Sequence, residues 1–184
     1  MCGCWPRAVG VAETGAVTKT TGDRDPGTIR ACVITASTRA AAGIYPDRSG
    51  PLLADELAAL GFEVAPVEVV SDGEQVGAAL RAAIGAYDIV MTTGGTGLTP
   101  NDLTPEKTRP LLDREIPHLT AEIVRIGVAK GVPTAVLSRG LAGVAGDTLV
   151  VNLPGSRGGV RDALEVLRPV LVHAVEQIRG GDHG

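Results

Sequence analysis

The chain has 184 residues, which is enough for one domain with a substantial hydrophobic core. Its formal net charge of −4 argues against a nucleic-acid partner, and no apolar run approaches the ~20 residues of a membrane-spanning helix. The N-terminus lacks the apolar segment of a secretory signal, and there are only three cysteines. We therefore expect a cytoplasmic protein that binds neither nucleic acid nor membrane.

The first 28 residues differ in composition from the rest of the chain. Small and polar residues dominate the segment 14–23, which shows neither helical nor strand periodicity. Such a segment buries too little apolar surface to offset the entropy lost on ordering. We predict a flexible N-terminal tail over residues 1–28 and one folded domain over residues 29–181.

Short apolar segments rich in Val, Ile and Thr recur along the domain and predict β-strands. The first is centred on Cys32-Val33-Ile34, a continuous apolar run of the kind found in strands buried on both faces. The segment 143–147, with two glycines and an aspartate, predicts a turn. In chain order, the predicted strands cover residues 32–38, 62–70, 89–93, 134–137 and 148–152.

Between these strands, apolar residues recur at helical spacing. Pro51 and Pro117 occupy predicted first turns, and Asp72 is a predicted helix N-cap. A further short helix is expected to start at Pro105. Pro169 interrupts the last apolar stripe, so that helix should be kinked or split.

This alternation of strands and helices predicts a three-layer, doubly wound α/β fold, with a mainly parallel sheet and helices on both faces. Open sheets of this kind bind ligands beyond the carboxyl ends of their strands. Polar residues that follow the predicted strands should therefore meet at one edge: Ser37, Asp72, Thr93, Ser138, Arg139 and Asn152.

The segment 92–106 is the most informative part of the sequence. It follows an apolar strand and places Gly94, Gly95 and Gly97 next to Thr96, with Asp102 shortly after them. Glycine permits positive φ, and consecutive free N–H groups in such a turn attract anions. The loop has neither the lysine of a Walker A motif nor the third glycine of a dinucleotide fingerprint. It predicts a phosphate-binding loop with a carboxylate placed to hold a metal.

The predicted edge contains no nucleophile paired with a base, such as Ser–His or Cys–His. Phosphoryl and nucleotidyl transfer do not need one, because alignment and charge neutralisation supply most of the catalysis. If the attacking group is a phosphate, it already carries roughly −1.5 to −2 charge at pH 7. Mg²⁺ held by Asp72 and Asp102 would reduce the repulsion between two anions.

These residues resemble the signature of the MogA/MoaB-type proteins of molybdenum-cofactor biosynthesis. The resemblance rests on 93–97 followed by Asp102 and 104–106, and on 47–51, 137–139 and 152–155 in the family's order. It implies a domain, usually trimeric, that binds molybdopterin and Mg-ATP. The implied reaction transfers AMP from ATP to the terminal phosphate of molybdopterin, with release of pyrophosphate. A further implied partner is the protein that inserts molybdenum into the product.

The resemblance also implies roles for individual residues of this chain. Asp72 and Asp102 would be catalytic and would organise Mg²⁺. The nucleotide and its phosphates would be held by Thr93, Gly94, Gly95, Thr96, Gly97, Asn152, Pro154, Gly155 and Ser156. The pterin would be contacted by Ser37, Asp47, Ser49, Ser138, Arg139 and Lys130. One departure is Thr38, where the family often has an aspartate, so no carboxylate role is assigned there.

Two other functions are compatible with the same residues. The chain could be a non-catalytic or regulatory paralogue that binds molybdopterin without using ATP. It could instead be a nucleotide pyrophosphatase-like relative that hydrolyses a dinucleotide through a similar glycine loop. Simpler interpretations of single residues also stand, since Asp72 could be only a helix cap and Ser138-Arg139 only a solvated strand end.

Overall fold

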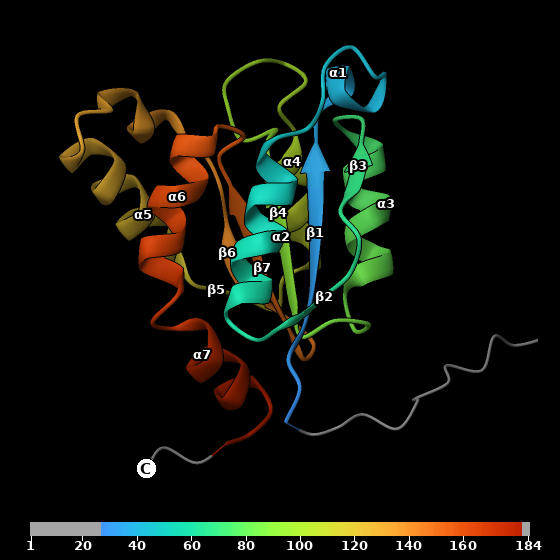
Figure 1. Ribbon diagram of the computed structural model, residues 1–184, viewed down its shortest axis with the longest axis vertical. Helices are drawn as coiled ribbons and strands as arrows, with labels where there is room; N and C mark the ends of the chain where they lie inside the picture. Colours follow the sequence, from blue (N-terminus) through green and yellow to red (C-terminus); the bar gives the residue numbers. More distant parts are fainter. Residues whose placement is uncertain (1–26, 182–184) are drawn as a thin grey trace, which may run out of the picture.

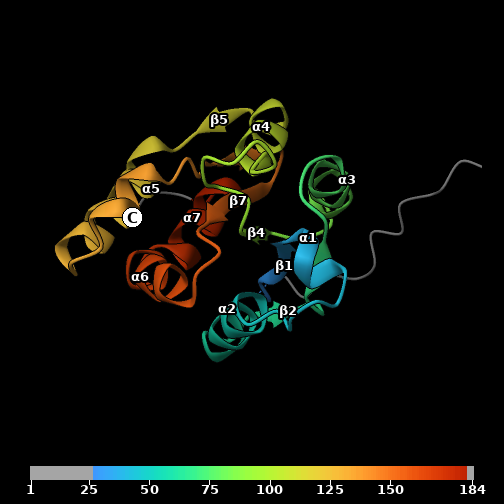
Figure 2. The same cartoon turned by 90° about the horizontal axis from the view of Figure 1, so that it is seen from above.

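The computed structural model describes residues 27–181 and contains three layers, a β-sheet between two sets of helices (Figure 1, Figure 2). This arrangement confirms the predicted α/β fold. The tail predicted over residues 1–28 lies outside the described residues except for its last two positions, so it stays a prediction. Within residues 27–181, none of the helices is long and apolar enough to cross a membrane.

The sheet is mainly parallel, with β1, β4 and β7 at its centre. Its strand order is β2-β1-β4-β7-β6-β5, and β3 also pairs with β1. The strands β2, β3 and β4 run parallel to β1, whereas β6 is antiparallel to both β7 and β5. Their bounds are β1 Arg30–Ala36, β2 Glu63–Val64, β3 Glu68–Val70, β4 Ile89–Thr93, β5 Arg114–Glu115, β6 Ala142–Ala145 and β7 Thr148–Leu153.

The helices connect the strands and cover both faces of the sheet. The last apolar stripe is split between α6 and α7 around Pro169, as predicted from the missing N–H and fixed φ of proline. The helix bounds are α1 Thr38–Ala41, α2 Ser49–Ala59, α3 Glu74–Ala83, α4 Thr104–Thr108, α5 Pro117–Ala129, α6 Arg157–Leu167 and α7 Leu171–Ile178, with the 3₁₀ turns η1 Arg109–Leu111 and η2 Pro133–Leu137.

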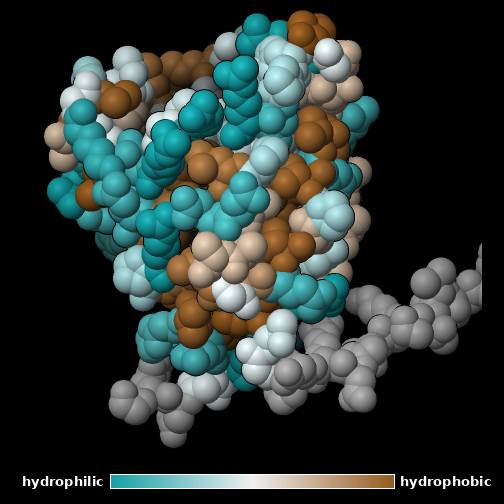
Figure 3. Space-filling view, in the orientation of Figure 1, coloured by the Kyte–Doolittle hydropathy of each residue, from teal (hydrophilic) through white to brown (hydrophobic). Residues whose placement is uncertain are grey.

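Two hydrophobic cores lie on opposite faces of the sheet because side chains alternate along each strand. Ala31 and Val33 of β1 face a core built with α2, α5, α6 and α7. Cys32 and Ile34 face a second core, built mainly with α3. On the surface seen in Figure 3, apolar and polar side chains are mixed around α2 and the sheet edge, where Leu60 and Val69 are exposed.

One strand prediction and one turn prediction on the antiparallel side of the sheet were wrong. Residues 134–137, expected as a strand, form the 3₁₀ turn η2, and most of the segment 143–147, expected as a turn, belongs to strand β6. Gly143 suggested a turn, but a Cβ at this position would lie 2.4 Å from the carbonyl oxygen of Arg114 on β5. Glycine is therefore needed for close strand pairing. The turn itself is Gly146-Asp147, where Gly146 has φ +57.

Three smaller expectations also need correction. The strand predicted over 62–70 is two short strands, because Pro66 cannot donate a hydrogen bond to β1 and interrupts the ladder between them. The loop expected after β1 contains α1, which is capped by Ser37. Asp72 is not the N-cap of α3, since Gly73 occupies that position and makes no side-chain capping bond.

Candidate functional site

The loop after β4 presents a row of backbone donors. Gly94 and Gly95 have φ +98 and +63, a region that non-glycine residues rarely adopt. Within residues 27–181, the N–H groups of Gly95, Thr96 and Gly97 donate to no protein acceptor, whereas the Gly94 N–H donates to the carbonyl oxygen of Leu153 at 3.1 Å. Three consecutive free N–H groups beside positive-φ glycines form a site for an anion.

A second loop, Pro154-Gly155-Ser156, faces the first and opens α6. The Ser156 hydroxyl oxygen accepts a hydrogen bond from the Gly159 N–H at 3.0 Å and so caps this helix. The Thr93 hydroxyl donates to the Pro154 carbonyl oxygen at 2.8 Å, which holds the loop against β4. A Cβ on Gly155 would lie 3.2 Å from the Cα of Gly94. The two loops therefore approach each other as closely as glycine allows.

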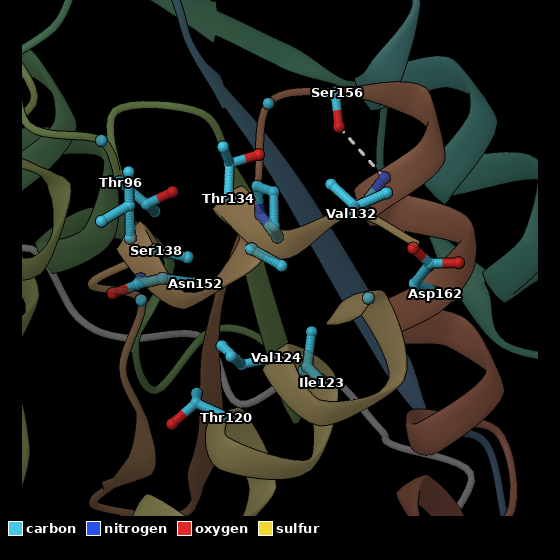
Figure 4. A pocket seen from close by; sticks show the side chains of 18 of the residues that line it. Thr96, Thr120, Ile123, Val124, Val132, Thr134, Ser138, Asn152, Ser156 and Asp162 are labelled. Carbon is cyan, nitrogen blue, oxygen red and sulfur yellow. Dashed lines mark hydrogen bonds between the residues drawn. The ribbon is translucent and has the colours of Figure 1, made fainter. Parts of the chain in front are cut away.

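Two cavities adjoin this contact, and both are lined by Gly94 and Gly155. The larger has a volume of about 900 Å³ and is enclosed by the glycine loop, α5, η2 and the start of α6 (Figure 4). The smaller has a volume of about 370 Å³ and lies between the end of β1, the loop before α2 and the start of α6. The glycine contact is thus a boundary between two spaces, each large enough for part of an organic ligand.

The structure distributes the predicted site residues between the two cavities. Those that line the larger cavity are Gly94, Gly95, Thr96, Gly97, Asp102, Ser138, Asn152, Pro154, Gly155 and Ser156. Those that line the smaller cavity are Ser37, Asp47, Ser49, Thr93, Gly94 and Gly155. Asp72, Lys130 and Arg139 line neither. The six residues expected around the pterin are consequently not brought together.

Asp72 and Asp102 approach the glycine loop at different positions: a Cβ on Gly95 would lie 3.3 Å from Asp72 Oδ1, and a Cβ on Gly97 would lie 2.8 Å from Asp102 Oδ2. One oxygen of Asp72, Oδ2, accepts hydrogen bonds from the Thr38 N–H at 2.9 Å and the Thr38 hydroxyl at 2.6 Å. One oxygen of Asp102, also Oδ2, accepts from the Thr99 N–H at 2.9 Å and the Thr99 hydroxyl at 2.7 Å. In each carboxylate, within residues 27–181, Oδ1 makes no hydrogen bond to protein. Each aspartate is therefore oriented through one oxygen and keeps the other available.

Thr104 is a site residue that the sequence pattern did not reveal. Its hydroxyl oxygen is buried and has no hydrogen-bond partner in the described part of the chain. A Cβ on Gly95 would lie 2.2 Å from this oxygen and 3.3 Å from Asp72 Oδ1. A carboxylate oxygen and an unpartnered hydroxyl therefore border the same small space beside the phosphate loop. The segment 104–106 indicated the start of a helix and formed part of the family resemblance, but it assigned no role to the Thr104 hydroxyl.

Arg139 holds the glycine loop in place rather than lining a cavity. Its Nε donates to the Gly97 carbonyl oxygen at 2.8 Å, and its Nη2 donates to the carbonyl oxygen of Asp102. Its Nη1 forms an ion pair with Glu106. Burial raises the pKa of the Glu106 carboxyl, but the hydrogen bond from Arg139, a backbone hydrogen bond and the charges of Arg139 and Arg109 together lower it. Arg139 thus positions the glycine loop, and its predicted contact with the pterin stays a prediction.

Asn152 also acts within the protein. Its amide nitrogen donates to the hydroxyl oxygens of Thr92 and Thr108, both at 3.0 Å, and its Oδ1 accepts from the Leu141 N–H at 3.2 Å. The side chain is buried, with both donors and its acceptor engaged. Asn152 thus links β4, α4 and the segment before β6, and its predicted contact with a nucleotide stays a prediction.

Asp47 organises the wall of the smaller cavity. Its Oδ2 accepts from the Thr35 hydroxyl at 2.7 Å, and its Oδ1 accepts from the N–H groups of Ser49 and Gly50 at 3.0 and 3.2 Å. These bonds fix the end of β1 against the first turn of α2. A Cβ on Gly50 would lie 2.4 Å from Asp47 Oδ2, so this position needs glycine.

Lys130 lies at the C-terminal end of α5 and pairs with two carboxylates of α6. Its Nζ donates to Asp162 Oδ1 at 2.9 Å and also pairs with Glu165. Hydrogen bonds from Glu165 and then Asp162 raise the pKa of Lys130, so the ammonium stays charged. Of these three residues, only Asp162 lines the larger cavity. No sequence motif marks the aspartate that this lysine holds.

The chain is similar to proteins of molybdenum-cofactor biosynthesis. Residues 32–173 match the family described as "Probable molybdopterin binding domain". The molybdopterin adenylyltransferase of Helicobacter pylori strain J99 is 35% identical over 160 residues, which cover 83% of this chain and 89% of that protein. The molybdenum cofactor biosynthesis bifunctional protein of Chlorobaculum tepidum is 38% identical over 84% of this chain, which spans 50% of that relative's length.

Solved structures show the same similarity. The molybdopterin biosynthesis Mog protein from Mycobacterium ulcerans is 54% identical and superposes with a TM-score of 0.77. The alignment covers 82% of this chain and 99% of that one. The sequence similarity and the fold similarity therefore point to one family of proteins.

Proposed function

We propose a function from one premise: this chain belongs to the MogA/MoaB-type family of molybdopterin-binding proteins. The proposed enzyme is a molybdopterin adenylyltransferase, which transfers AMP from Mg-ATP to the terminal phosphate of molybdopterin and releases pyrophosphate. The observation that carries this proposal is the row of free N–H groups at Gly95, Thr96 and Gly97, beside the boundary between two cavities. The use of ATP fits a cytoplasmic location.

The geometry suits a reaction between two phosphate-bearing ligands. One heterocycle would occupy each cavity, and both phosphate groups would lie near Gly94 and Gly155, which line both spaces. A terminal phosphate oxygen of molybdopterin forms a bond to the α-phosphorus of ATP, while the bond from that phosphorus to the bridging oxygen breaks and pyrophosphate leaves. The attacking phosphate is already ionised, so the protein needs no general base.

The protein's contribution to this step is alignment and charge neutralisation. Free N–H groups of the glycine loop would donate to phosphate oxygens, and the N-terminus of α6 adds its partial positive charge on the opposite side. Arg139 fixes the loop through the carbonyl oxygens of Gly97 and Asp102. These donors are oriented before substrate arrives, so little reorganisation is required during the reaction.

The residues near the loop also fit Mg²⁺. Asp72 Oδ1 and the Thr104 hydroxyl border one small space beside Gly95, and Asp102, beside Gly97, lines the larger cavity. Hard oxygen donors of this kind suit Mg²⁺, which usually takes one or two carboxylates and completes its shell with phosphates and water. Within residues 27–181 there is no cluster of three or more His, Cys, Asp or Glu around a metal position. When bound, the ion supplies charge neutralisation between the two substrates.

The proposal is tested by incubating the full-length chain with Mg-ATP and molybdopterin, while pyrophosphate and adenylated pterin are both quantified. Asp72→Asn and Asp102→Asn should each lower kcat on the order of 10²-fold or more, since each removes charge at the phosphates. The matched control is Asp55→Asn, an exposed aspartate on α2 that lines neither cavity. Equal pyrophosphate release by wild type and both site variants would refute the assigned roles.

The same assay separates the two competing functions. A regulatory paralogue would bind molybdopterin but form no adenylated product. A pyrophosphatase-like enzyme would hydrolyse a dinucleotide in the absence of pterin. Assembly as a homotrimer and transfer of the product to a molybdenum-inserting protein belong to the same proposal, and sedimentation of the purified chain tests the first of these.

A further inference from the structure

Asp162 is a carboxylate in the larger cavity that no motif of the proposed reaction uses. It comes from α6 and lies opposite Thr96 and Ser138 in the view of Figure 4. Its side chain is only 16% exposed. Burying a charged carboxylate is costly unless it is paired, and here Lys130 Nζ lies 2.9 Å from Oδ1.

The second oxygen of Asp162 is free. Within residues 27–181, Oδ2 accepts no hydrogen bond, and it is directed toward Gly127 of α5, where a Cβ would lie 3.9 Å away. Gly127 has no side chain that could fill this space, and it also lines the cavity. Oδ1 can accept a second bond beside the one from Lys130. The carboxylate therefore offers two acceptors to a ligand in the larger cavity.

The two heterocycles of the proposed reaction differ in what they can donate to such a pair of acceptors. A pterin has an amino group next to a ring N–H, which form two parallel donors matching a carboxylate, as a guanidinium does. Adenine has an amino group between ring nitrogens that are acceptors, so one carboxylate oxygen would face a lone pair. An ionised carboxylate thus favours the pterin edge over the adenine edge.

We propose that Asp162 recognises the amino-pyrimidinone edge of the pterin, which assigns the larger cavity to molybdopterin. Lys130 is then a positioning residue that fixes the orientation of the carboxylate, and it does not contact the pterin. The smaller cavity, which shares Gly94 and Gly155, is left for the nucleotide. This inference rests on the proposed function, because that function supplies the two heterocycles.

The test uses binding rather than turnover. The full-length chain is titrated with 6-hydroxymethylpterin phosphate and with the matching lumazine, in which oxygen replaces the 2-amino group. Wild type should bind the pterin about 10- to 100-fold more tightly, because the lumazine places an oxygen against the carboxylate. This comparison needs no variant. Equal binding of the two probes would overturn the inference.

Variants then assign the preference to Asp162. Asp162→Asn should weaken binding of the pterin probe about tenfold or more and reduce its preference over lumazine, while AMP binding stays unchanged. Lys130→Met should weaken binding of the pterin probe by a smaller factor than Asp162→Asn does. Lys130→Arg should bind the pterin probe as wild type does. The matched control is Glu165→Gln, which also contacts Lys130 but lies outside the cavity, and it should leave the preference intact.

The outcomes separate this inference from the proposed function. If Asp162→Asn binds the pterin probe as wild type does while adenylated molybdopterin still forms, the recognition role is wrong and the function stands. If the variant loses AMP binding instead, the two cavities have been assigned in reverse. If wild type binds no pterin and forms no adenylated product, both proposals fail.

Discussion

The two cavities beside the Gly94–Gly155 contact differ in how their polar atoms are used. In the smaller one, Asp47 accepts hydrogen bonds from Thr35, Ser49 and Gly50, so both of its oxygens are engaged within the protein. In the larger one, the N–H groups of 95–97 and one oxygen of Asp162 have no protein partner in the described chain. A motif residue can therefore serve the fold, whereas a free donor or acceptor in a cavity indicates recognition.

The largest effect is expected where the two cavities meet. A Cβ at Gly94 would lie 2.3 Å from the carbonyl oxygen of Ala36, and the residue has φ +98. Gly94→Ala should lower the free energy of unfolding by ~3–5 kcal/mol, from backbone strain and overpacking, and abolish pyrophosphate release. Denaturant unfolding measures the change in free energy of unfolding. Quantifying pyrophosphate released in the presence of Mg-ATP and molybdopterin measures the loss of activity.

Gly131→Ala is the matched control for this change. Gly131 has φ +85, but a Cβ there would meet no atom within 4 Å. Gly131→Ala should lower the free energy of unfolding by only ~1–2 kcal/mol and leave turnover unchanged. Similar loss of activity in both variants would mean that the contact between the loops has no special role.

Substitutions at Asp47 and Ser138 compare a side chain that stabilises the fold with one that lines the larger cavity. Asp47→Ala removes the acceptor of a buried threonine hydroxyl and of two N–H groups in the first turn of α2, so the free energy of unfolding should fall by ~2–3 kcal/mol. Ser138→Ala, in the larger cavity, should change stability by less than ~0.5 kcal/mol. Chemical denaturation of both variants makes the comparison. If Ser138→Ala proved the more destabilising, the distinction drawn between the cavities would be wrong.

A smaller effect is expected from Arg139, which supports the larger cavity without lining it. Arg139→Lys keeps the charge but cannot donate simultaneously to Gly97, Asp102 and Glu106. We expect kcat to fall about tenfold through misplacement of the glycine loop. Arg168→Lys, which changes only an ion pair with Glu56 far from the loop, serves as the control. An unchanged kcat in Arg139→Lys would rule out the proposal that Arg139 holds the glycine loop in place for catalysis.

The smallest effect concerns Cys32, which lies in the core and in neither cavity. Burial, with a further contribution from the Glu68 charge, raises the pKa of the Cys32 thiol to about 11. Above pH ~9 the unfolded chain releases this proton while the folded chain keeps it. Stability should therefore fall between about pH 9 and 11, by ~1 kcal/mol at pH 10. Cys32→Ala should remove this component of the pH dependence in denaturation curves, and an identical slope in both proteins would contradict it.

Most of the fold follows from local sequence signals. The strands β1, β4 and β7 are continuous apolar runs, and their parallel order follows from the helices between them. The antiparallel edge could not be predicted in the same way. Gly143 has the composition of a turn but is required by the close approach of β5, a contact between residues distant in the chain. A contact with a distant strand can therefore require glycine at a position where the local sequence alone predicts a turn.

In the site, too, some features follow from the local sequence and others depend on contacts between distant parts of the chain. The glycine loop was predictable because positive φ and free N–H groups are properties of a few consecutive residues. The roles of Arg139, Asn152 and Lys130 were not, because each side chain is directed by partners on other elements. Thr104 and Asp162 escaped notice for a related reason: their importance lies in an oxygen left without a partner, which only the assembled structure reveals.

The central claim is that the free N–H groups after β4 hold phosphates at the boundary of the two cavities. The most direct test is a crystal structure of the chain with Mg²⁺, a non-hydrolysable ATP analogue and a pterin phosphate. We predict phosphate oxygens within hydrogen-bond distance of the Gly95, Thr96 and Gly97 nitrogens, with one heterocycle in each cavity. Phosphates bound elsewhere, or both heterocycles in one cavity, would contradict the claim.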